Sequence, residues 1–265
     1  MRLKDRVAIV TGGGRGIGKA ISKAFASEGA RVVIAGPVPS ESEKTVEEIT
    51  SRGGWAMAVK TDIREEDQIR RAVAESVKAC GRIDILVNNS GVGGPTAPVV
   101  DMDLEKWNEV LSIDLTGGML FSREVLKVMI PQKRGNIIYM AAEGGRAGDG
   151  RGGYPMRSAY CCAKMGVIGL TETLAIEVGQ HSIRVNAISP AAVKGERMME
   201  VARAKSKATG IPLDELINGK FKVYSLMRPT EEFEVAAAAV FLASDESSAV
   251  TGQTLIVNCG HHVLF

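Results

Sequence analysis

The chain has 265 residues, of which 45% are hydrophobic and 24% are charged. Its 33 Lys and Arg residues nearly balance its 31 Asp and Glu residues, and a net charge of +2 gives no reason to expect a nucleic-acid or membrane-surface partner. The length fits one large domain, and the apolar content excludes intrinsic disorder. Glycine is in excess, at 30 of 265 residues, or about 11% against roughly 7% in average proteins.

Short apolar runs rich in β-branched residues alternate along the chain with longer stretches of helical periodicity. We expect strands at residues 7–10, 31–35, 56–60, 83–88, 136–140, 183–188 and 254–257. We expect helices at residues 17–27, 41–51, 66–79, 104–129, 158–178 and 231–242. Short apolar strands are typical of a sheet covered on both faces, and repeated strand–helix alternation implies parallel strands with right-handed crossovers. The sequence therefore predicts an α/β fold, with a doubly wound parallel seven-stranded sheet in a single domain over residues 1–265.

One long segment, at about residues 191–230, interrupts this alternation. Connections of that length inside a compact domain are usually functional. We therefore expect one or two helices in this segment, forming a lid over a substrate site.

The cysteine and histidine content indicates a compartment and argues against a metal centre. The chain has four cysteines, too few for a disulfide scaffold, at Cys80, Cys161, Cys162 and Cys259. They predict reduced thiols in a cytoplasmic protein. We expect neither a signal peptide nor a membrane span, because the N-terminal apolar run ends in glycines and no stretch approaches about 18 apolar residues. The three histidines show no ligand spacing with cysteines or carboxylates, so we expect no metal ion; they are His181, His261 and His262.

A glycine-rich turn lies between the first expected strand and the first expected helix. It reads Thr11-Gly12-Gly13-Gly14-Arg15-Gly16-Ile17-Gly18. Glycines let the backbone turn tightly and let a diphosphate approach main-chain N–H groups, and the positive end of the following helix adds to the attraction. The strand–turn–helix context favours a dinucleotide site over a purely structural turn.

This spacing resembles the short-chain dehydrogenase/reductase family, and further motifs follow in the family's order. They are Asn88-Asn89-Ser90-Gly91, similar to Asn-Asn-Ala-Gly; Tyr160-Cys161-Cys162-Ala163-Lys164, similar to Tyr-x-x-x-Lys; Arg184-Val185-Asn186-Ala187-Ile188-Ser189-Pro190, similar to Arg-Val-Asn-x-x-x-Pro; and Thr251-Gly252-Gln253, similar to the entry to the C-terminal strand. The resemblance covers essentially the whole chain. It implies a Rossmann-like fold and hydride transfer between a nicotinamide cofactor and an alcohol or ketone.

The resemblance also implies cofactor contacts outside the glycine turn. They are expected from Asn89 and Gly91 after the fourth strand and from Pro190 after the sixth. The family usually continues with Gly and, further on, a Thr that touches the carboxamide. This chain has Ala191 and Gly195 instead, so we expect the backbone of Val193 to be the anchor.

Residues near the end of the second strand bear on the choice between NADP and NAD. Gly36 provides no carboxylate there to bind the ribose 2′-OH of NAD or to repel a 2′-phosphate. Arg15 resembles the basic residue of NADP-preferring relatives, and Ser40 can add a hydrogen bond to the 2′-phosphate. The alternative interpretation of Arg15 is a solvated surface charge. We therefore expect NADP, with NAD the less favoured cofactor.

After the third strand, Asp62, with Ile63 beside it, resembles the adenine-contacting aspartate of the family. Capping of the next helix is a compatible role for Asp62.

Tyr160 and Lys164 are four residues apart on an expected helix, so they share one face. Reduction of a ketone needs an acid for the forming alkoxide, and the reverse reaction needs a base. A free tyrosine titrates at about 10, and a nearby ammonium favours the phenolate. Tyr160 is therefore expected to exchange the proton. The family resemblance implies that Lys164 also holds the nicotinamide ribose.

Two positions depart from the family's pattern. Ala142 stands where the family has a serine that hydrogen-bonds the substrate oxygen. An oxyanion donor of this kind is worth about 3 kcal/mol, or 10²-fold and upward in rate. Asp114 stands where the family has an asparagine, on the helix after the fourth strand. An aspartate can still accept hydrogen bonds in this relay position, but it adds a negative charge.

Three explanations of Ala142 remain open. The chain is an active reductase with a substitute donor, for which Ser158, Tyr139 or a water are the candidates and Glu143 lies nearby. Alternatively, Ala142 inactivates an otherwise competent scaffold. Finally, the fold performs non-redox work as a lyase, isomerase or binding protein that retains its dinucleotide.

The substrate and partners are less constrained. A small-molecule carbonyl or alcohol is expected, and a cluster of basic residues favours an anionic group on it; these residues are Arg146, Arg151, Arg157, Lys194, Arg197, Arg203, Lys205, Lys207, Lys220 and Lys222. The same stretch carries acidic residues, so a solvated face is the alternative. The resemblance implies a homotetramer or homodimer, with the helices at 104–129 and 158–178 in the interface. The apolar residues at the C-terminal end are expected to pack against a neighbouring subunit.

Overall fold

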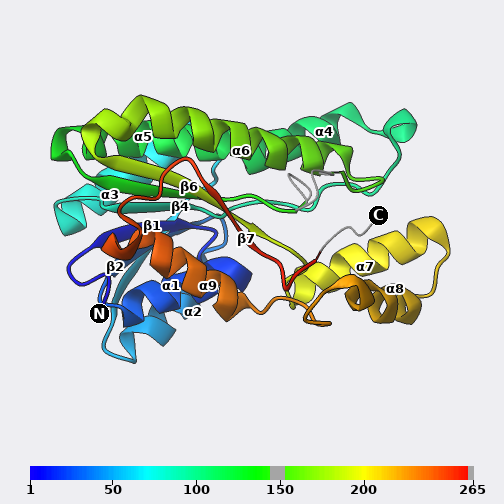
Figure 1. The fold of residues 1–265 in the computed structure, drawn as a ribbon. Helices are drawn as coiled ribbons and strands as arrows, with labels where there is room; N and C mark the ends of the chain where they lie inside the picture. The colour runs from blue at the N-terminus through cyan, green and yellow to red at the C-terminus, as the bar shows by residue number, and fades with distance from the viewer. Residues whose placement is uncertain (144–152, 262–265) are drawn as a thin grey trace.

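The computed structural model describes residues 1–143 and 153–261 of the chain (Figure 1). Arg146, Arg151 and His262 lie outside the described residues. Seven strands form one sheet, and they are β1 (Val7–Thr11), β2 (Arg31–Gly36), β3 (Trp55–Lys60), β4 (Ile85–Asn88), β5 (Gly135–Met140), β6 (Ile183–Pro190) and β7 (Thr254–Val257). All pairs are parallel, in the order β3-β2-β1-β4-β5-β6-β7. The predicted doubly wound, seven-stranded sheet is confirmed.

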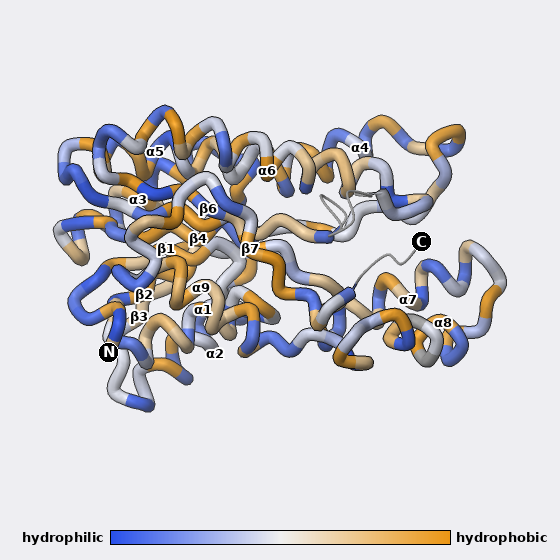
Figure 2. The backbone as a smooth tube through the Cα atoms, viewed as in Figure 1, coloured by the Kyte–Doolittle hydropathy of each residue, from blue (hydrophilic) through white to orange (hydrophobic). Residues whose placement is uncertain are grey.

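Helices cover both faces of the sheet (Figure 1). On one face lie α1 (Gly16–Ser27), α2 (Pro39–Thr50) and α9 (Glu232–Ala243). On the other face lie α3 (Glu66–Cys80), α5 (Gly117–Gln132) and α6 (Ser158–Val178). Two apolar cores result, one between the sheet and each helical layer, and the hydrophobic colour of the strands in Figure 2 reflects their burial from both sides.

The strand order reverses at β1, which pairs with β2 on one side and with β4 on the other. Val10 of β1 lies opposite both Ile34 and Val87. The crossovers leave these strands in opposite directions, so a crevice opens at their carboxyl ends. Segments that follow β1, β4, β5 and β6 therefore meet at one edge of the sheet, where the expected site residues lie.

The single helix expected at 104–129 is present over Leu104 to Gln132, but it contains an irregular turn. It consists of α4 (Leu104–Leu111), a π-helical turn (Ser112–Thr116) and α5. A π turn accommodates an extra residue by changing the hydrogen-bond partner from i−4 to i−5, and such turns are frequent at functional sites. Asp114 lies in this turn and is buried. Hydrophobic periodicity alone does not locate such a turn.

The two C-terminal motifs form a structural joint between β6 and β7. The Arg184 guanidinium donates to the carbonyls of Leu242 and Ser244 at 2.9 Å. Asn186 is fully buried; its amide donates to the carbonyl of Val250 at 2.8 Å and accepts from the backbone N–H of Gln253 at 3.0 Å. These bonds attach the edge strand β7 to the sheet, so both motifs serve the fold.

The long segment between β6 and α9 contains two helices, α7 (Glu196–Thr209) and α8 (Leu213–Lys220). They project beyond the carboxyl edge of the sheet (Figure 1). The two ends of the segment are joined, because Lys194 N–H donates to the Thr230 carbonyl at 2.8 Å and Thr230 N–H donates to that of Ala192 at 3.0 Å. No residue of α7 is buried, so this helix packs only lightly on the rest of the chain.

Within residues 1–143 and 153–261, none of the helices has both the length and the apolar character that a bilayer span needs. Over the same ranges, the His, Cys, Asp and Glu side chains form no group of three that could hold a metal ion.

Candidate active site

The glycine-rich turn joins β1 to α1 in a conformation that requires glycine. Gly12 has φ of +63° and Gly16 has φ of +54°, both in the left-handed region that disfavours residues with a Cβ. A Cβ on Gly18 would collide with the carbonyl oxygen of Gly12 and with the side-chain amide of Asn89. The first turn of α1 has no acidic residue, and its N-cap, Arg15, makes no side-chain cap hydrogen bond. The helix N-terminus therefore offers backbone N–H groups to an anion.

Asn89 is placed beside this turn, and its own hydrogen bonds are made to the protein. Its side-chain amide donates to the carbonyls of Thr11 at 2.9 Å and Gly12 at 3.3 Å. The Thr11 hydroxyl in turn accepts from the backbone N–H groups of Asn89 and Ser90, at 2.9 and 3.0 Å. These bonds hold the ends of β1 and β4 together, so Asn89 shapes the glycine turn.

The end of β2 carries no carboxylate at Gly36, but a carboxylate approaches from α2. Glu41 lies in the first turn of α2, and its Oε2 is 3.8 Å from Nε of Arg15. The Arg15 side chain is 80% exposed, so this pair is loose. Sequence reasoning considered Gly36, Arg15 and Ser40 but missed Glu41, which the first turn of α2 brings back toward the glycine turn.

Asp62 follows β3 and forms a local pair with Arg64 at 2.6 Å. The hydrogen bonds from Arg64 hold the pKa of the Asp62 carboxyl below its usual range. The prediction that Asp62 caps the next helix is wrong, because the Asp62 carboxylate instead accepts the N–H of Arg64 in a tight turn and the N-cap of α3 is Glu65. Ile63 is buried against Gly117, where a Cβ would overlap its side chain.

A buried ion pair joins Asp114 in the π turn to Lys164 on α6. The Lys164 Nζ lies 3.2 Å from Asp114 Oδ2, and the two side chains are 6% and 0% exposed. Asp114 Oδ1 accepts the backbone N–H of Val92 at 2.6 Å, and Lys164 donates to the Met140 carbonyl at 3.0 Å. A Cβ on Gly91 would lie 3.1 Å from the Asp114 carboxylate, so the loop after β4 packs directly on the pair.

Tyr160, one turn before Lys164, is half-buried among cations. The Lys164 Nζ is 5.7 Å from the centre of the Tyr160 ring, and the Arg157 guanidinium is 4.9 Å from it. Arg157 is 9% exposed, donates to the Gly93 carbonyl at 2.6 Å, and has no carboxylate within 4 Å among the described residues. Burial lowers the pKa of Arg157, and the charge of Arg197 on α7 acts in the same direction. Sequence reasoning counted Arg157 only among basic residues, because stacking on a tyrosine has no sequence signal.

Ala142 lies two residues past β5, is 6% exposed and has no hydrogen-bonding side chain. Of the suggested substitute donors, Tyr139 is wrong. Strand alternation points its side chain into the core under α5, where its hydroxyl lies 2.5 Å from Ser122 Oγ. The Ser158 Oγ is buried without a hydrogen-bond partner among the described residues. It belongs to the first turn of α6, two residues before Tyr160.

The backbone after β6 lies at the same edge. Pro190 ends β6, and its carbonyl accepts the N–H of Glu143 at 3.3 Å, which fixes the segment after β5 to the end of β6. Val193 forms an isolated parallel bridge with Thr230, made by the backbone groups of Ala192 and Lys194. The N–H and carbonyl of Val193 itself take no part in this bridge.

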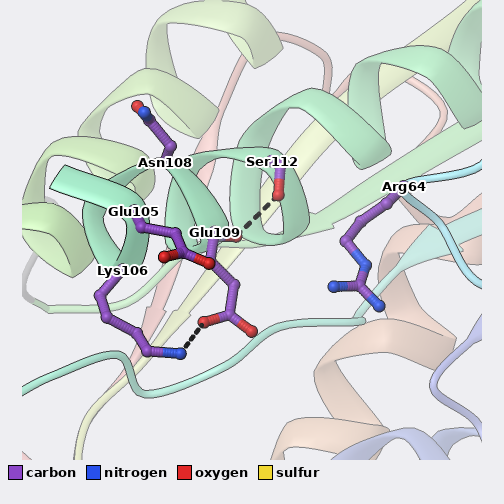
Figure 3. Close-up of a pocket in the computed structure, with 6 residues that line it drawn as sticks. All are labelled: Arg64, Glu105, Lys106, Asn108, Glu109 and Ser112. Atoms are coloured by element: carbon purple, nitrogen blue, oxygen red, sulfur yellow. Dashed lines mark hydrogen bonds and ion pairs between the residues drawn. The ribbon is translucent and has the colours of Figure 1, made fainter.

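A separate hollow of about 350 Å³ lies on the surface beside α4 (Figure 3). It is lined by Arg64, Glu105, Lys106, Asn108, Glu109 and Ser112. Two of its residues are paired, Lys106 with Glu109 at 3.2 Å (Figure 3). None of the expected catalytic or cofactor residues lines this hollow, so the site is assigned to the edge where the motifs converge.

Comparisons with known proteins agree with this arrangement. A family model described as enoyl-(acyl carrier protein) reductase matches residues 12–262. The chain is 37% identical over 264 residues to the 3-oxoacyl-(acyl-carrier-protein) reductase FabG of Thermotoga maritima, covering 98% of this chain and 99% of that protein. It is 35% identical over 260 residues to the uncharacterized oxidoreductase YxbG of Bacillus subtilis, covering 98% and 92%.

Solved structures are similar over the whole chain. Levodione reductase has a TM-score of 0.92 at 29% identity, covering 100% of both chains. NAD⁺-bound xylitol dehydrogenase also has a TM-score of 0.92 at 29% identity, covering 97% of this chain and 99% of the other.

The four tyrosines provide a spectroscopic test of the site. Burial raises the pKa of Tyr139 and of Tyr154, and it raises the pKa of Tyr224 to about 12. We therefore expect the tyrosinate absorbance of Tyr224 to develop above the ordinary tyrosine value of about 10. Ultraviolet difference titration of the wild type and of Tyr224→Phe measures this. Loss of a signal that develops below about 10 in Tyr224→Phe would contradict the assignment.

Proposed function

The chain belongs to the short-chain dehydrogenase/reductase family, and from that premise we propose that it transfers a hydride between NADP(H) and a small alcohol or ketone. The observation that carries this proposal is the buried pair of Asp114 and Lys164 beside Tyr160, at the edge where the glycine turn lies. Oxidoreductase activity agrees with the named relatives.

The residues present fit a dinucleotide. Gly12 and Gly18 leave the space that a Cβ would fill, and the N-terminus of α1 presents free N–H groups. Gly36, Asp62 and Ile63 lie along the adenosine side, as the family resemblance implies. Gly91, Pro190 and Val193 would hold the nicotinamide side, as the same resemblance implies. The bound cofactor supplies or takes up the hydride.

Tyr160 exchanges the proton with the substrate oxygen. The Lys164 ammonium, 5.7 Å from the centre of the Tyr160 ring, would hold the nicotinamide ribose, while Asp114 takes the relay position. Because Asp114 Oδ1 already accepts the Val92 N–H and Oδ2 faces Lys164, Asp114 also orients the ammonium. Lys164 is thus held by the ion pair with Asp114 and by its hydrogen bond to the Met140 carbonyl.

Ala142 supports a second candidate, a dinucleotide-binding relative that does not turn over. In the active alternative, Ser158 or a water supplies the donor that Ala142 lacks, and the unpartnered Ser158 Oγ supports this. The two candidates differ in whether the natural chain reduces any carbonyl compound.

Turnover of the wild type, Ala142→Ser and Tyr160→Phe on a panel of ketones separates these candidates. We expect the wild type to be active and Tyr160→Phe to lose about 10²-fold or more in kcat. Ala142→Ser should gain about 10²-fold in kcat, because a restored oxyanion donor contributes about 3 kcal/mol. NADPH binding, followed by fluorescence, should be unchanged in both variants. Activity confined to Ala142→Ser would identify the wild type as the silent relative. If the wild type and Ala142→Ser were both inactive, the proposed reaction would be overturned.

We prefer NADP to NAD because Gly36 brings no carboxylate to the end of β2 and the Arg15 side chain is free to reach a 2′-phosphate. Glu41 opposes this preference, since its carboxylate lies beside Arg15. A 2′-phosphate bound to Arg15 must displace or tolerate this loose pair. The net preference therefore depends on two charges that can be removed separately.

Arg15→Ala should weaken NADPH binding about tenfold, through loss of a charge-assisted hydrogen bond, and leave NADH binding nearly unchanged. Glu41→Gln should strengthen NADPH binding, because it removes a nearby like charge from the phosphate. Fluorescence titration with both nucleotides measures these constants. Arg52→Ala, at an exposed arginine after α2, is the matched control. Tight NADH binding without NADPH binding in the wild type would reverse the assignment.

The segment at about 191–230 is proposed as the substrate lid. Its ends are joined at Thr230, and Arg197 on α7 lies close enough to Arg157 to influence its pKa.

An anionic group on the substrate is supported by Arg157, which is buried beside Tyr160. The basic residues of the lid itself support it less, because Lys194 and Arg203 pair with Glu231 and Glu196.

We further propose a cytoplasmic homotetramer or homodimer. The four cysteines are free thiols, as a reducing compartment favours. Three large apolar side chains on α5 and α6 are exposed in the single chain, Met119 at 36%, Met165 at 46% and Ile176 at 84%, and burial between subunits would remove them from water. Sedimentation of the wild type should give a multiple of 28.1 kDa, and Ile176→Asp should shift it toward the monomer. A monomeric wild type would contradict the interface.

A further inference from the structure

A buried carboxylate, Glu143, lies next to the position of the missing serine. It directly follows Ala142, and its backbone N–H is fixed to the Pro190 carbonyl. Glu143 is 2% exposed. Its Oε2 accepts the Tyr154 hydroxyl at 3.2 Å and lies 2.8 Å from His261 Nδ1. The proposed reaction uses none of these side chains.

The other carboxylate oxygen, Glu143 Oε1, is buried and has no hydrogen-bond partner among the described residues. No lysine or arginine of these residues lies within 4 Å of the Glu143 carboxylate, whose basic neighbour is the imidazole of His261. An unpartnered buried carboxylate oxygen costs free energy, and native structures rarely retain one without a use. Oε1 is therefore an acceptor without a partner among the described residues, on the side chain that follows Ala142.

Aromatic packing holds the carboxylate in place. The His261 ring stacks on Tyr224 with centroids 4.3 Å apart, and Tyr224 is 2% exposed. Burial, followed by the charge on Glu143, raises the pKa of Tyr224 to about 12 and also raises that of Tyr154. Both phenols are therefore protonated at neutral pH. Tyr154 donates to the carboxylate, which leaves Oε1 as the acceptor available to a ligand.

Tyr154 connects this carboxylate to Tyr160. Its backbone N–H lies 3.2 Å from the Sγ of Cys161, the residue after Tyr160. Its hydroxyl lies on Glu143, and the Tyr154 phenol is close enough to Tyr160 for the charge of one to affect the other. Glu143 is thus one side chain away from the expected acid–base residue, on the side where Ala142 has replaced serine.

An ionised carboxylate only accepts hydrogen bonds. It cannot donate to a substrate carbonyl, and it would repel the alkoxide that forms there. It can accept from a hydroxyl on a neighbouring carbon, provided that Tyr160 serves the reacting oxygen. Sites built to bind a hydroxyl discriminate strongly against analogues that lack it, because their polar groups are then left unpaired.

We propose that Glu143 is a specificity-determining residue. Its Oε1 accepts a hydrogen bond from a substrate hydroxyl on the carbon next to the reacting carbon. The preferred substrates are therefore α-hydroxyketones and vicinal diols. This inference rests on the proposed oxidoreductase function and names its substrate class. His261 is a positioning residue, which holds the carboxylate through Oε2 against the Tyr224 ring.

The experiment compares substrates that differ by one hydroxyl. Acetoin is paired with butanone for reduction, and cyclohexanediol is paired with cyclohexanol for oxidation. We expect the wild type to favour the hydroxylated member of each pair by about 10²-fold in kcat/KM. In Glu143→Leu this preference should fall to near unity, because the hydroxylated member of each pair loses its acceptor. Glu143→Gln, which keeps an acceptor oxygen and the side-chain shape, should retain part of it.

Glu28→Gln is the matched control, since Glu28 lies at the end of α1 and pairs with Arg2, outside the site. Its preference should equal that of the wild type. Equal kcat/KM for both members of each pair in the wild type, or an unchanged preference in Glu143→Leu, would overturn the inference and leave the proposed reaction intact.

A binding measurement decides the inference if no carbonyl compound is turned over. Calorimetry in the Tyr160→Phe background compares acetoin with butanone on the cofactor-loaded protein. Tighter binding of acetoin that is lost when Glu143→Leu is added supports the role of Oε1. Equal binding of the two ketones, or no binding of acetoin, overturns it.

Discussion

The buried ion pair between Asp114 and Lys164 is the interaction on which the site depends. It links the π turn, helix α6, the Met140 carbonyl at the end of β5 and, through Val92, the loop after β4. Four segments far apart in the sequence thus meet at one charge pair. Removing one partner of such a pair leaves an uncompensated buried charge, which typically lowers the free energy of unfolding by about 3–5 kcal/mol. The same residues therefore affect both stability and function.

Two further ionisable side chains, Arg157 and Glu143, lie at the same edge of the sheet as this pair. Arg157 stacks on the Tyr160 ring from one side, and Glu143 lies beyond Tyr154 on another. Neither residue has a charged Lys, Arg, Asp or Glu partner within 4 Å among the described residues. Buried groups of both types, an arginine and a glutamate, therefore lie at the edge that carries Ala142. Such an edge suits a polar substrate better than a purely apolar one.

The elements were predictable because their signals are local. Apolar runs of four to eight residues and helical periodicity indicated all seven strands and the six principal helices. The irregular turn around Asp114 was missed, because one inserted residue barely changes the periodicity. Capping by Asp62 was predicted wrongly, because a two-residue turn to Arg64 competes for the same carboxylate. Tyr139 was misassigned because β-strand alternation, rather than nearness in sequence, decides which side a residue faces.

The sequence by itself determined the fold class, the glycine turn and the spacing of Tyr160 and Lys164, because each depends on residues close together in the chain. The tertiary structure alone decided which distant groups meet: Glu41 with Arg15, Asp114 with Lys164, and Glu143 with His261, 118 residues away. Parallel strands bring their carboxyl ends to one edge whatever their order in the sequence, and the contacts made there depend on loop and helix geometry that no local pattern encodes.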